Sequence, residues 1–231
     1  GPLDSAHEAA LVAAAEERLP DCGALILSDY GKGVLSADVI CRLIELARAA
    51  GKPVIVDPKG QDFAKYRGAT LLTPNRAELA LASGRPVGDD AEILAACRHV
   101  VENCGVEGLL ATRSEQGMTL FHRAADGHET LHHLPARARE VFDVAGAGDT
   151  VAALLAAGLA TGAGMSAAAQ LANTAAGSAL ARMTCLTASM GTSIFSCRLL
   201  SFTPAVMDTP ASEGRPANSA ARGFIPPSLR R

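Results

Sequence analysis

One polar run combines residue types suited to phosphoryl transfer, VFDVAGAGDT at positions 141–150. It leads directly into an alanine- and leucine-rich stretch, Val151 to Ala160, that is predicted to be helical. A glycine-containing turn of this kind points backbone N–H groups and the positive end of a helix dipole at one spot, which suits an anion. Asp149 stands beside that spot and could take a proton from an attacking hydroxyl. The run therefore indicates phosphoryl transfer to an alcohol, although by itself it also fits an ordinary helix N-cap.

The elements that must position this run alternate between strand and helix. Short apolar strands are predicted at 23–28, 54–56, 70–72 and 108–112, with helices at 8–19, 37–50, from 75, and at 91–103. Short apolar strands separated by helices imply a mostly parallel sheet with both faces covered, an α/β fold. Residues 118–141 alternate with period two and predict an antiparallel edge hairpin, and two closing helices are predicted at 151–159 and 166–181.

The chain is long enough for one sizeable domain, with 231 residues of which 48% are hydrophobic. A net charge of -3 gives no electrostatic case for binding nucleic acid or an anionic membrane. Apolar runs stay short of the roughly 20 residues that a membrane span needs. The six cysteines are scattered and read as reduced thiols, so a cytoplasmic enzyme is predicted. We assign residues 1–195 to the domain and expect 196–231, which lack sustained periodicity, to be a disordered tail.

Two further polar motifs follow predicted strands. Asp57-Pro58-Lys59 comes directly after the second strand, and Asn75-x-x-Glu78 opens a helix after the third. Each has a simple structural explanation, a turn for the first and a relative of the capping box for the second. Ligands of parallel α/β sheets bind at the carboxyl ends of the strands, so both motifs are also placed to contact a ligand.

The pattern Asp-x-x-Gly-Ala-Gly-Asp that ends at Asp149 resembles the C-terminal signature of the ribokinase/PfkB family of carbohydrate kinases. The resemblance implies a ribokinase-like three-layer α/β/α sandwich. It gives Asp149 the role of catalytic base and assigns the anion hole to the backbone N–H groups of Gly146, Ala147 and Gly148. The family usually has threonine where Ala145 stands, a change that removes a hydroxyl but no backbone donor.

The resemblance also implies a site for ATP and Mg²⁺. By analogy with the family, Glu78 acts on Mg²⁺ through water, and Asn75 contacts phosphate or the water shell of the metal. Asp57 and Lys59 are assigned to the same nucleotide site. No P-loop motif and no Gly-x-Gly-x-x-Gly after a strand occurs in the sequence, so those two nucleotide-binding routes are excluded.

The adenine end of the nucleotide is assigned to two other segments. The turn from Thr112 to Gly117 resembles the Thr-x-Gly-x-x-Gly turn of the family, with Ser114 where the first glycine is common. Asn173 begins a run of small residues in the last predicted helix that fits the wall beside the adenine. Small residues on a helix serve helix packing equally well, so this second assignment rests on the resemblance alone.

Several longer segments are similar to one subfamily, the D-glycero-β-D-manno-heptose-7-phosphate kinases of lipopolysaccharide precursor synthesis. They are residues 27–33, 57–60, 66–75 and 112–118, within a resemblance that runs from about Leu19 to Gly177. The implied reaction phosphorylates the anomeric hydroxyl of the heptose 7-phosphate to give the 1,7-bisphosphate. Asp29 and Lys32, from the first segment, are assigned to the sugar substrate, with the alternative that Lys32 is a solvated surface lysine.

The family's kinase domain carries a further N-terminal third, with a Gly-Gly sugar motif and a lid that often mediates dimerisation, and this third has no counterpart in the sequence. A homodimer is therefore an expectation for the full-length enzyme. Three interpretations stay open: a heptose 7-phosphate kinase, another sugar or nucleoside kinase of the same family, and a catalytically incomplete fragment that binds nucleotide.

Overall fold

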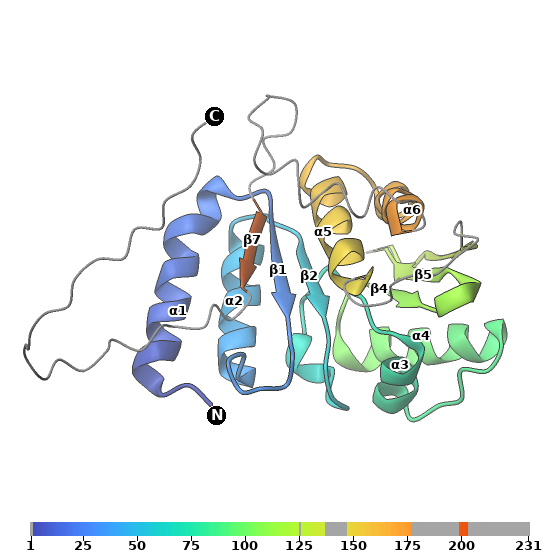
Figure 1. Ribbon diagram of the computed structural model, residues 1–231, viewed down its shortest axis with the longest axis horizontal. Coiled ribbons are helices and arrows are strands. Elements are labelled where there is room, and N and C mark those ends of the chain that lie inside the picture. The colour runs from blue at the N-terminus through green and yellow to red at the C-terminus, as the bar shows by residue number, and fades with distance from the viewer. Residues whose placement is uncertain (1, 125, 137–146, 177–198, 203–231) are drawn as a thin grey trace, which may run out of the picture.

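The computed structural model describes residues 2–124, 126–136, 147–176 and 199–202 (Figure 1). Its strands are β1 (Ala24–Ser28), β2 (Val54–Asp57), β3 (Leu71–Leu72), β4 (Gly108–Thr112), β5 (Met118–Arg123), β6 (Glu129–Leu134) and β7 (Leu199–Phe202). Within these ranges they form one sheet in the order β6-β5-β4-β3-β2-β1-β7. Pairing is parallel from β7 to β4, and the hairpin of β5 and β6 is antiparallel. The predicted parallel sheet with an antiparallel edge hairpin is therefore present.

The helices fall in the predicted places with small differences at their ends. They are α1 (Ser5–Arg18), α2 (Ala37–Ala49), α3 (Arg76–Ser83), α4 (Asp90–Cys104), α5 (Ala147–Ala160) and α6 (Met165–Ala176). The start of α1 lies earlier than predicted because the Asp4 side chain accepts a hydrogen bond from the N–H of His7 and caps the helix. Gly84 and Gly105 end α3 and α4 in left-handed backbone conformations. The predicted continuation of the last helix to residue 181 lies outside the described residues.

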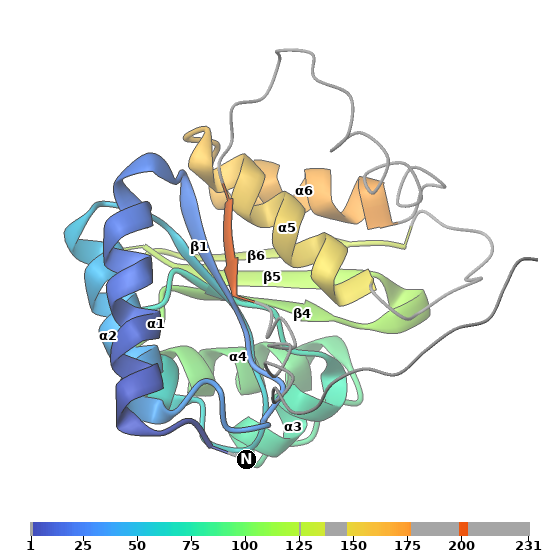
Figure 2. The same ribbon diagram turned by 60° about the vertical axis from the view of Figure 1, so that its left-hand side comes forward.

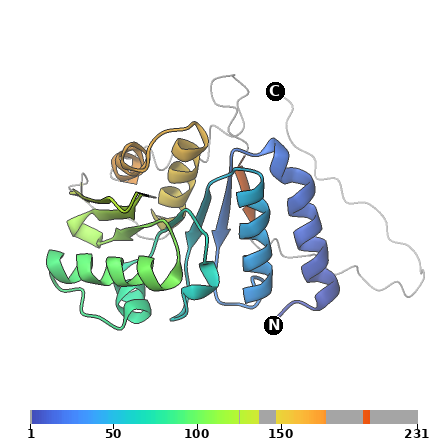
Figure 3. The ribbon, with the colours of Figure 1, turned by 180° about the vertical axis from the view of Figure 1, so that it is seen from behind.

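The sheet lies between two layers of helices, because successive residues of each strand point to opposite faces. In β1, Leu25 and Leu27 pack with the helices α1, α2 and α4 in one core. Ala24 and Ile26 pack with α5 and α6 in the other. Figure 2 shows α5 and α6 on one side of the sheet with α3 and α4 on the other, and Figure 3 shows α1 and α2 from behind. The three layers match the predicted α/β/α sandwich.

Strand β7 was not predicted. Its residues pair in parallel with β1, with Ala24 opposite Leu199 and Leu27 opposite Phe202. The segment has only four residues and no periodicity, and it forms a strand because the edge of β1 offers unpaired backbone groups. The expectation of a disordered tail from 196 onward is therefore wrong for 199–202, and for the rest it concerns residues outside those described.

None of the described helices is long and apolar enough to cross a membrane.

Candidate functional site

The carboxyl edge of the parallel strands gathers most of the predicted site residues. Asp29 follows β1, Asp57 ends β2, Asn75 follows β3, and Thr112 ends β4. Because these strands are adjacent and parallel, their last residues meet at one edge of the sheet. Helix α5 packs against β1 and β2 from the opposite core, and Asp149 lies in its first turn. The fold thus brings a helix N-terminus and several carboxylates to the same place.

The carboxylate of Asp57 is at the centre of this concentration of negative charge. Burial, together with the charges of Glu78, Asp149 and Asp29, raises its pKa to about 6 against the opposing charge of Lys59. The three other acids come from α3, α5 and the loop after β1. A site with so many carboxylates around one partly buried acid favours a cation as ligand.

Glu78 has both oxygens engaged by residues of the predicted site. Its Oε2 accepts a hydrogen bond from the N–H of Asn75 at 3.0 Å, while the Asn75 side chain accepts one from the N–H of Glu78 at 2.9 Å. This reciprocal pair is the capping box that the sequence indicated. The other oxygen, Oε1, accepts from the Nζ of Lys59 at 2.7 Å. Hydrogen bonding to Glu78 raises the pKa of Lys59, so the ammonium stays charged.

Asp29 is buried and organises its own loop. Its Oδ1 accepts from the N–H of Gly31 at 2.7 Å, and its Oδ2 accepts from the Nζ of Lys65 and the hydroxyl of Tyr66, each at 2.7 Å. Burial alone would raise the pKa of Asp29, but these three hydrogen bonds outweigh it and hold the pKa below its usual value. Both oxygens are thus used within the protein. Lys32, the other residue assigned to the sugar, is exposed in the same loop.

Tyr30, in the loop after β1, lies within the influence of the charge of Asp149. It is 45% exposed, which is unusual for a large aromatic residue in a sheet-edge loop. The charge of Asp149 is the main cause that raises the pKa of its phenol, and the charge of Asp57 contributes. The loop after β1 and the first turn of α5 therefore face the same space. Asp149 and Gly148 are exposed there, whereas Gly146 of the predicted anion hole lies outside the described residues and Ala147 is described only as the first residue of α5.

The predicted nucleotide turn is held in an unusual backbone conformation. Ser114 has a φ of 53°, in the left-handed region where glycine is favoured, which explains why a glycine is common at this position in the family. At Gly117 the φ is 85°, and a Cβ there would meet the carbonyl oxygen of Leu134 and the N–H of Ala136. Thr112 is tied to the neighbouring motif, since its N–H donates to the carbonyl of Pro74 at 2.9 Å.

Asn173 joins the same region from α6. It is 5% exposed, and its Nδ2 donates to the carbonyl of Pro135 at 2.9 Å. Pro135 directly follows β6 and lies against Gly117. The structure therefore places Asn173 beside the turn from Thr112 to Gly117, although its own side-chain amide is used to hold the end of the hairpin.

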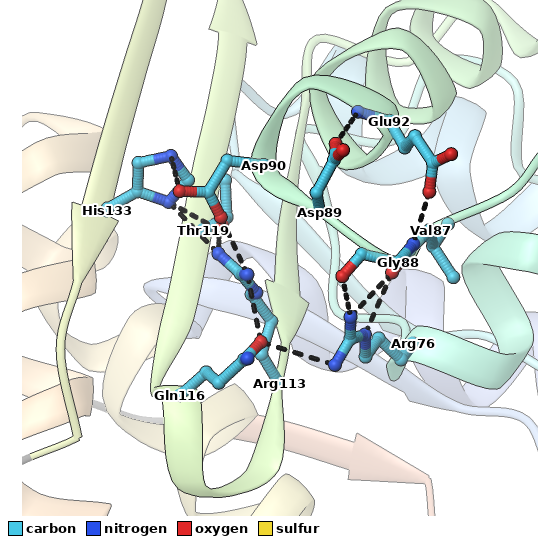
Figure 4. A network of polar contacts seen from close by, with 10 residues as sticks. All are labelled: Arg76, Val87, Gly88, Asp89, Asp90, Glu92, Arg113, Gln116, Thr119 and His133. Atoms are coloured by element: carbon cyan, nitrogen blue, oxygen red, sulfur yellow. Dashed lines mark hydrogen bonds and ion pairs between the residues drawn. The ribbon is translucent and has the colours of Figure 1, made fainter.

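A network of polar contacts around Arg113 holds the turn from Thr112 to Gly117 in place (Figure 4). The guanidinium of Arg113, 6% exposed, pairs with Asp90 at the start of α4 at 2.7 Å. It also donates to the Oε1 of Gln116 at 2.9 Å and to the hydroxyl of Thr119 at 3.2 Å, and its Nη1 lies 3.3 Å from the Nδ1 of His133. Arg113 thus connects the turn to α4 and to both strands of the hairpin.

The residues also fit a magnesium ion bound together with a nucleotide. Mg²⁺ in such sites is held by one or two carboxylates, several waters and the substrate phosphates. Burial and the charges of Glu78 and Asp149 raise the pKa of Asp57, and a cation bound nearby would favour its ionised form. In the described part of the chain no three His, Cys, Asp or Glu side chains are grouped so that they could hold a metal ion.

Some contributors to the site were missed by the sequence analysis. Lys65 and Tyr66, which hold Asp29, lie in a 3₁₀ turn, η2 (Ala64–Tyr66), whose position relative to β1 no local pattern indicates. Arg113 lies in a turn, where charged side chains are usually solvated, so the sequence alone gives no sign that it is buried. Tyr30 stood in a segment used for the subfamily resemblance, and its exposed aromatic ring in a glycine-rich loop was the available signal.

Comparisons with known proteins agree with this geometry. The model of the pfkB family carbohydrate kinases matches residues 3–190. The bifunctional protein HldE of Rhodospirillum rubrum is 55% identical over 182 residues, which are 79% of this chain and 36% of that protein. HldE of Paramagnetospirillum magneticum is 54% identical over 176 residues, 76% of this chain and 35% of the relative. The chain thus spans about a third of the length of these curated relatives.

Solved structures show the same fold at lower identity. Ribokinase of Arabidopsis thaliana, complexed with ribose and ATP, has a TM-score of 0.59 at 23% identity, over 71% of this chain and 51% of that one. Phosphofructokinase-2 of Escherichia coli, in complex with fructose-6-phosphate, has a TM-score of 0.62 at 19% identity, over 78% and 58%. These matches support the ribokinase-like fold.

Proposed function

The chain belongs to the pfkB family of carbohydrate kinases, and from this membership we propose that it contributes the nucleotide-binding and catalytic part of a kinase for D-glycero-β-D-manno-heptose 7-phosphate. The observation that carries the proposal is the position of Asp149. It lies in the first turn of α5, and its charge acts on Tyr30 and Asp57, which follow two different strands at the same edge of the sheet. The similarity to two HldE proteins and the segments at 27–33 and 66–75 favour the heptose phosphate over other sugars.

The proposed reaction moves the γ-phosphoryl group of ATP to the anomeric hydroxyl. The carboxylate of Asp149 accepts the hydroxyl proton as the sugar oxygen bonds to phosphorus, and the bond from phosphorus to the bridging oxygen of ADP breaks. Backbone N–H groups at the start of α5, together with the helix dipole, stabilise the negative charge on the transferring group. Mg²⁺ bound with the nucleotide would neutralise charge on the phosphates.

The remaining predicted residues have distinct roles in this proposal. Glu78, held in the capping box with Asn75, would bind the water shell of Mg²⁺, and Asn75 would contact phosphate or that water shell. Asp57 would add a second carboxylate that a cation would keep ionised. The turn from Thr112 to Gly117 lies along the nucleotide. The loop that begins with Asp29 and contains Lys32 receives the sugar phosphate.

The test is ADP release with Mg-ATP and the heptose 7-phosphate, beside ribose, fructose 6-phosphate and a nucleoside as competing acceptors. Asp149→Asn serves as the catalytic variant, and Glu17→Gln, on the exposed side of α1, as the control. Sugar-dependent turnover that falls by about 10²–10⁴ in Asp149→Asn alone supports the proposal. Preference for another acceptor supports a different kinase of the family. ATP binding without turnover on any acceptor supports a nucleotide-binding unit that needs further residues for catalysis.

A further inference from the structure

The hydroxyl of Tyr66 joins two loops that are separate in the sequence. It donates a hydrogen bond to the Oδ2 of Asp29, in the loop after β1, at 2.7 Å. It accepts one from the N–H of Lys59, in the loop after β2, at 3.0 Å. Both loops start at the carboxyl edge of the sheet, where Ser28 and Asp57 are paired in register. One oxygen atom therefore connects the loop assigned to the sugar with the loop assigned to the nucleotide.

The chemistry of this hydroxyl suits a permanent link. Tyr66 is fully buried, and burial is the main cause that raises the pKa of its phenol, so the group stays protonated. A protonated phenol offers one donor and an acceptor, and here each is used by a different loop. The ring itself is packed edge-to-face on Phe63, with ring centroids 5.8 Å apart. Packing of the ring and bonding of the hydroxyl are thus separable functions.

Asp29 links the Tyr66 hydroxyl to the backbone of the loop after β1. Its Oδ2 is held by Tyr66 and by Lys65, whose Nζ lies 2.7 Å away, and its Oδ1 accepts from the N–H of Gly31 two residues later. A carboxylate bonded to a backbone N–H two residues on forms a turn that fixes the intervening residue. That residue is Tyr30, and the charge of Asp149 raises the pKa of its phenol.

We propose that Tyr66 is a positioning residue: its hydroxyl sets the loop after β1 relative to the loop after β2, and thereby places Tyr30 and Lys32 to receive the sugar phosphate. Asp29 then shapes the substrate loop from within and leaves contact with the sugar to its neighbours. The inference rests on the proposed function for its consequence in catalysis, whereas the link between the two loops can be measured without any substrate.

The decisive variant is Tyr66→Phe, which keeps the ring and removes the hydroxyl. The matched control is Thr70→Val, because the Thr70 hydroxyl accepts a hydrogen bond from the N–H of Val54. This bond lies at the start of β2 and β3, away from the carboxyl edge that holds the candidate site. Each variant loses one hydroxyl that accepts from a backbone N–H, and a loss of general stability would affect both. Two quantities are measured: hydrogen exchange of the Lys59 and Gly31 amides without ligand, and the steady-state constants for the sugar phosphate and for ATP.

We expect the amide of Lys59 to exchange about tenfold faster in Tyr66→Phe and to be unchanged in Thr70→Val. The KM for the sugar phosphate should rise about tenfold while kcat and the Kd of ATP change less than about twofold. In an Asp29→Asn background Tyr66→Phe should add little, because both changes break the same connection. The inference would be overturned if the exchange rate of the Lys59 amide were unchanged in Tyr66→Phe or rose equally in Thr70→Val. It would also be overturned if the effects of Tyr66→Phe and Asp29→Asn on the KM for the sugar phosphate were additive. If the unaltered chain shows no turnover, the proposed kinase activity is contradicted for this chain. The hydrogen-exchange experiment then tests by itself whether the Tyr66 hydroxyl connects the loops after β1 and β2.

Discussion

The ammonium of Lys59 lies 2.7 Å from the Oε1 of Glu78. The lysine that ends the Asp57-Pro58-Lys59 motif is therefore ion-paired with the glutamate that ends the Asn75-x-x-Glu78 motif. The second oxygen of Glu78 already accepts the N–H of Asn75 in the capping box. A cation that approaches Glu78, with or without an intervening water, therefore competes with Lys59 for the same oxygen. The Lys59 side chain is 54% exposed and can move, whereas Glu78 is 13% exposed and held at its helix.

Removal of this ammonium should lower the Mg²⁺ concentration required for ATP binding. In Lys59→Met the Oε1 of Glu78 is free, and the half-saturating Mg²⁺ concentration should fall about two- to fivefold, the range expected for an ion pair with one exposed partner. The measurement is ATP binding by calorimetry across a Mg²⁺ titration. Lys52→Met, a partly buried lysine outside this edge, is the control. A higher Mg²⁺ requirement in Lys59→Met would show that Lys59 assists the metal instead of competing with it.

Asp57 should make the protein less stable as the pH rises from about 4 to about 6. Burial and the neighbouring charges of Glu78 and Asp149 raise its pKa to about 6 in the folded state, above the value near 3.9 in an unfolded chain, so the folded state binds the proton more tightly. Ionisation then costs about 3 kcal/mol of folding free energy, and this cost is fully present above pH 6 and absent below pH 4. Asp57→Asn should accordingly raise the Tm at pH 8 and leave it nearly unchanged at pH 4. An equal gain at both pH values would contradict this assignment.

Gly117 should tolerate no side chain. A Cβ at this position would meet the backbone of Leu134, Pro135 and Ala136, and the φ of 85° is itself unfavourable for other residues. Gly117→Ala should cost about 3 kcal/mol or more and weaken ATP binding, because the end of the hairpin must move away from the turn. Ser114→Gly, three residues earlier at a φ of 53°, should instead stabilise the protein by up to about 1 kcal/mol. Urea unfolding of both variants checks the opposite signs, and equal signs would refute the account of the turn.

Arg113 should be irreplaceable by lysine, although both carry one positive charge. The guanidinium bonds to Asp90, Gln116 and Thr119 at once, and a lysine ammonium on a flexible stem cannot reproduce this planar set of donors. Arg113→Lys should lose about 2 kcal/mol of stability and weaken ATP affinity several-fold through the loosened turn. Asp90→Asn, which removes only the exposed partner, should have a smaller effect on both. A wild-type ATP affinity in Arg113→Lys would show that the network serves stability alone.

The sheet and the convergence of its motifs were predictable because they follow from local patterns. Four short apolar runs alternate with amphipathic stretches, and parallel strands necessarily place Asp57, Asn75 and Thr112 at one edge. The capping box at Glu78 was likewise indicated by residue spacing alone, and the structure confirms it. The roles assigned to these residues in binding ATP and sugar stay predictions.

Other features depend on side chains that meet across long stretches of sequence. The pair of Lys59 and Glu78 and the bonds of Tyr66 require knowledge of where each loop turns after its strand, which spacing does not reveal. Arg113 is buried although it lies in a turn, and its guanidinium contacts Asp90 of α4 and Thr119 and His133 of the hairpin. Strand β7 was missed because its four residues carry no period and gain their partner only from the open edge of β1.

The pairing of β7 with β1 has a consequence for how the chain folds. Strands β1 to β4 can pair through connections that are local in the sequence. Ala24 of β1, in contrast, can pair with β7 only once Leu199 is available. Contacts between residues so distant in sequence form slowly, because a long loop must first close. During synthesis on a ribosome the edge of β1 that pairs with β7 therefore stays unpaired until residues 199–202 have emerged. We expect that interval to be the period in which nascent chains are most prone to associate with one another and in which a chaperone has most to protect.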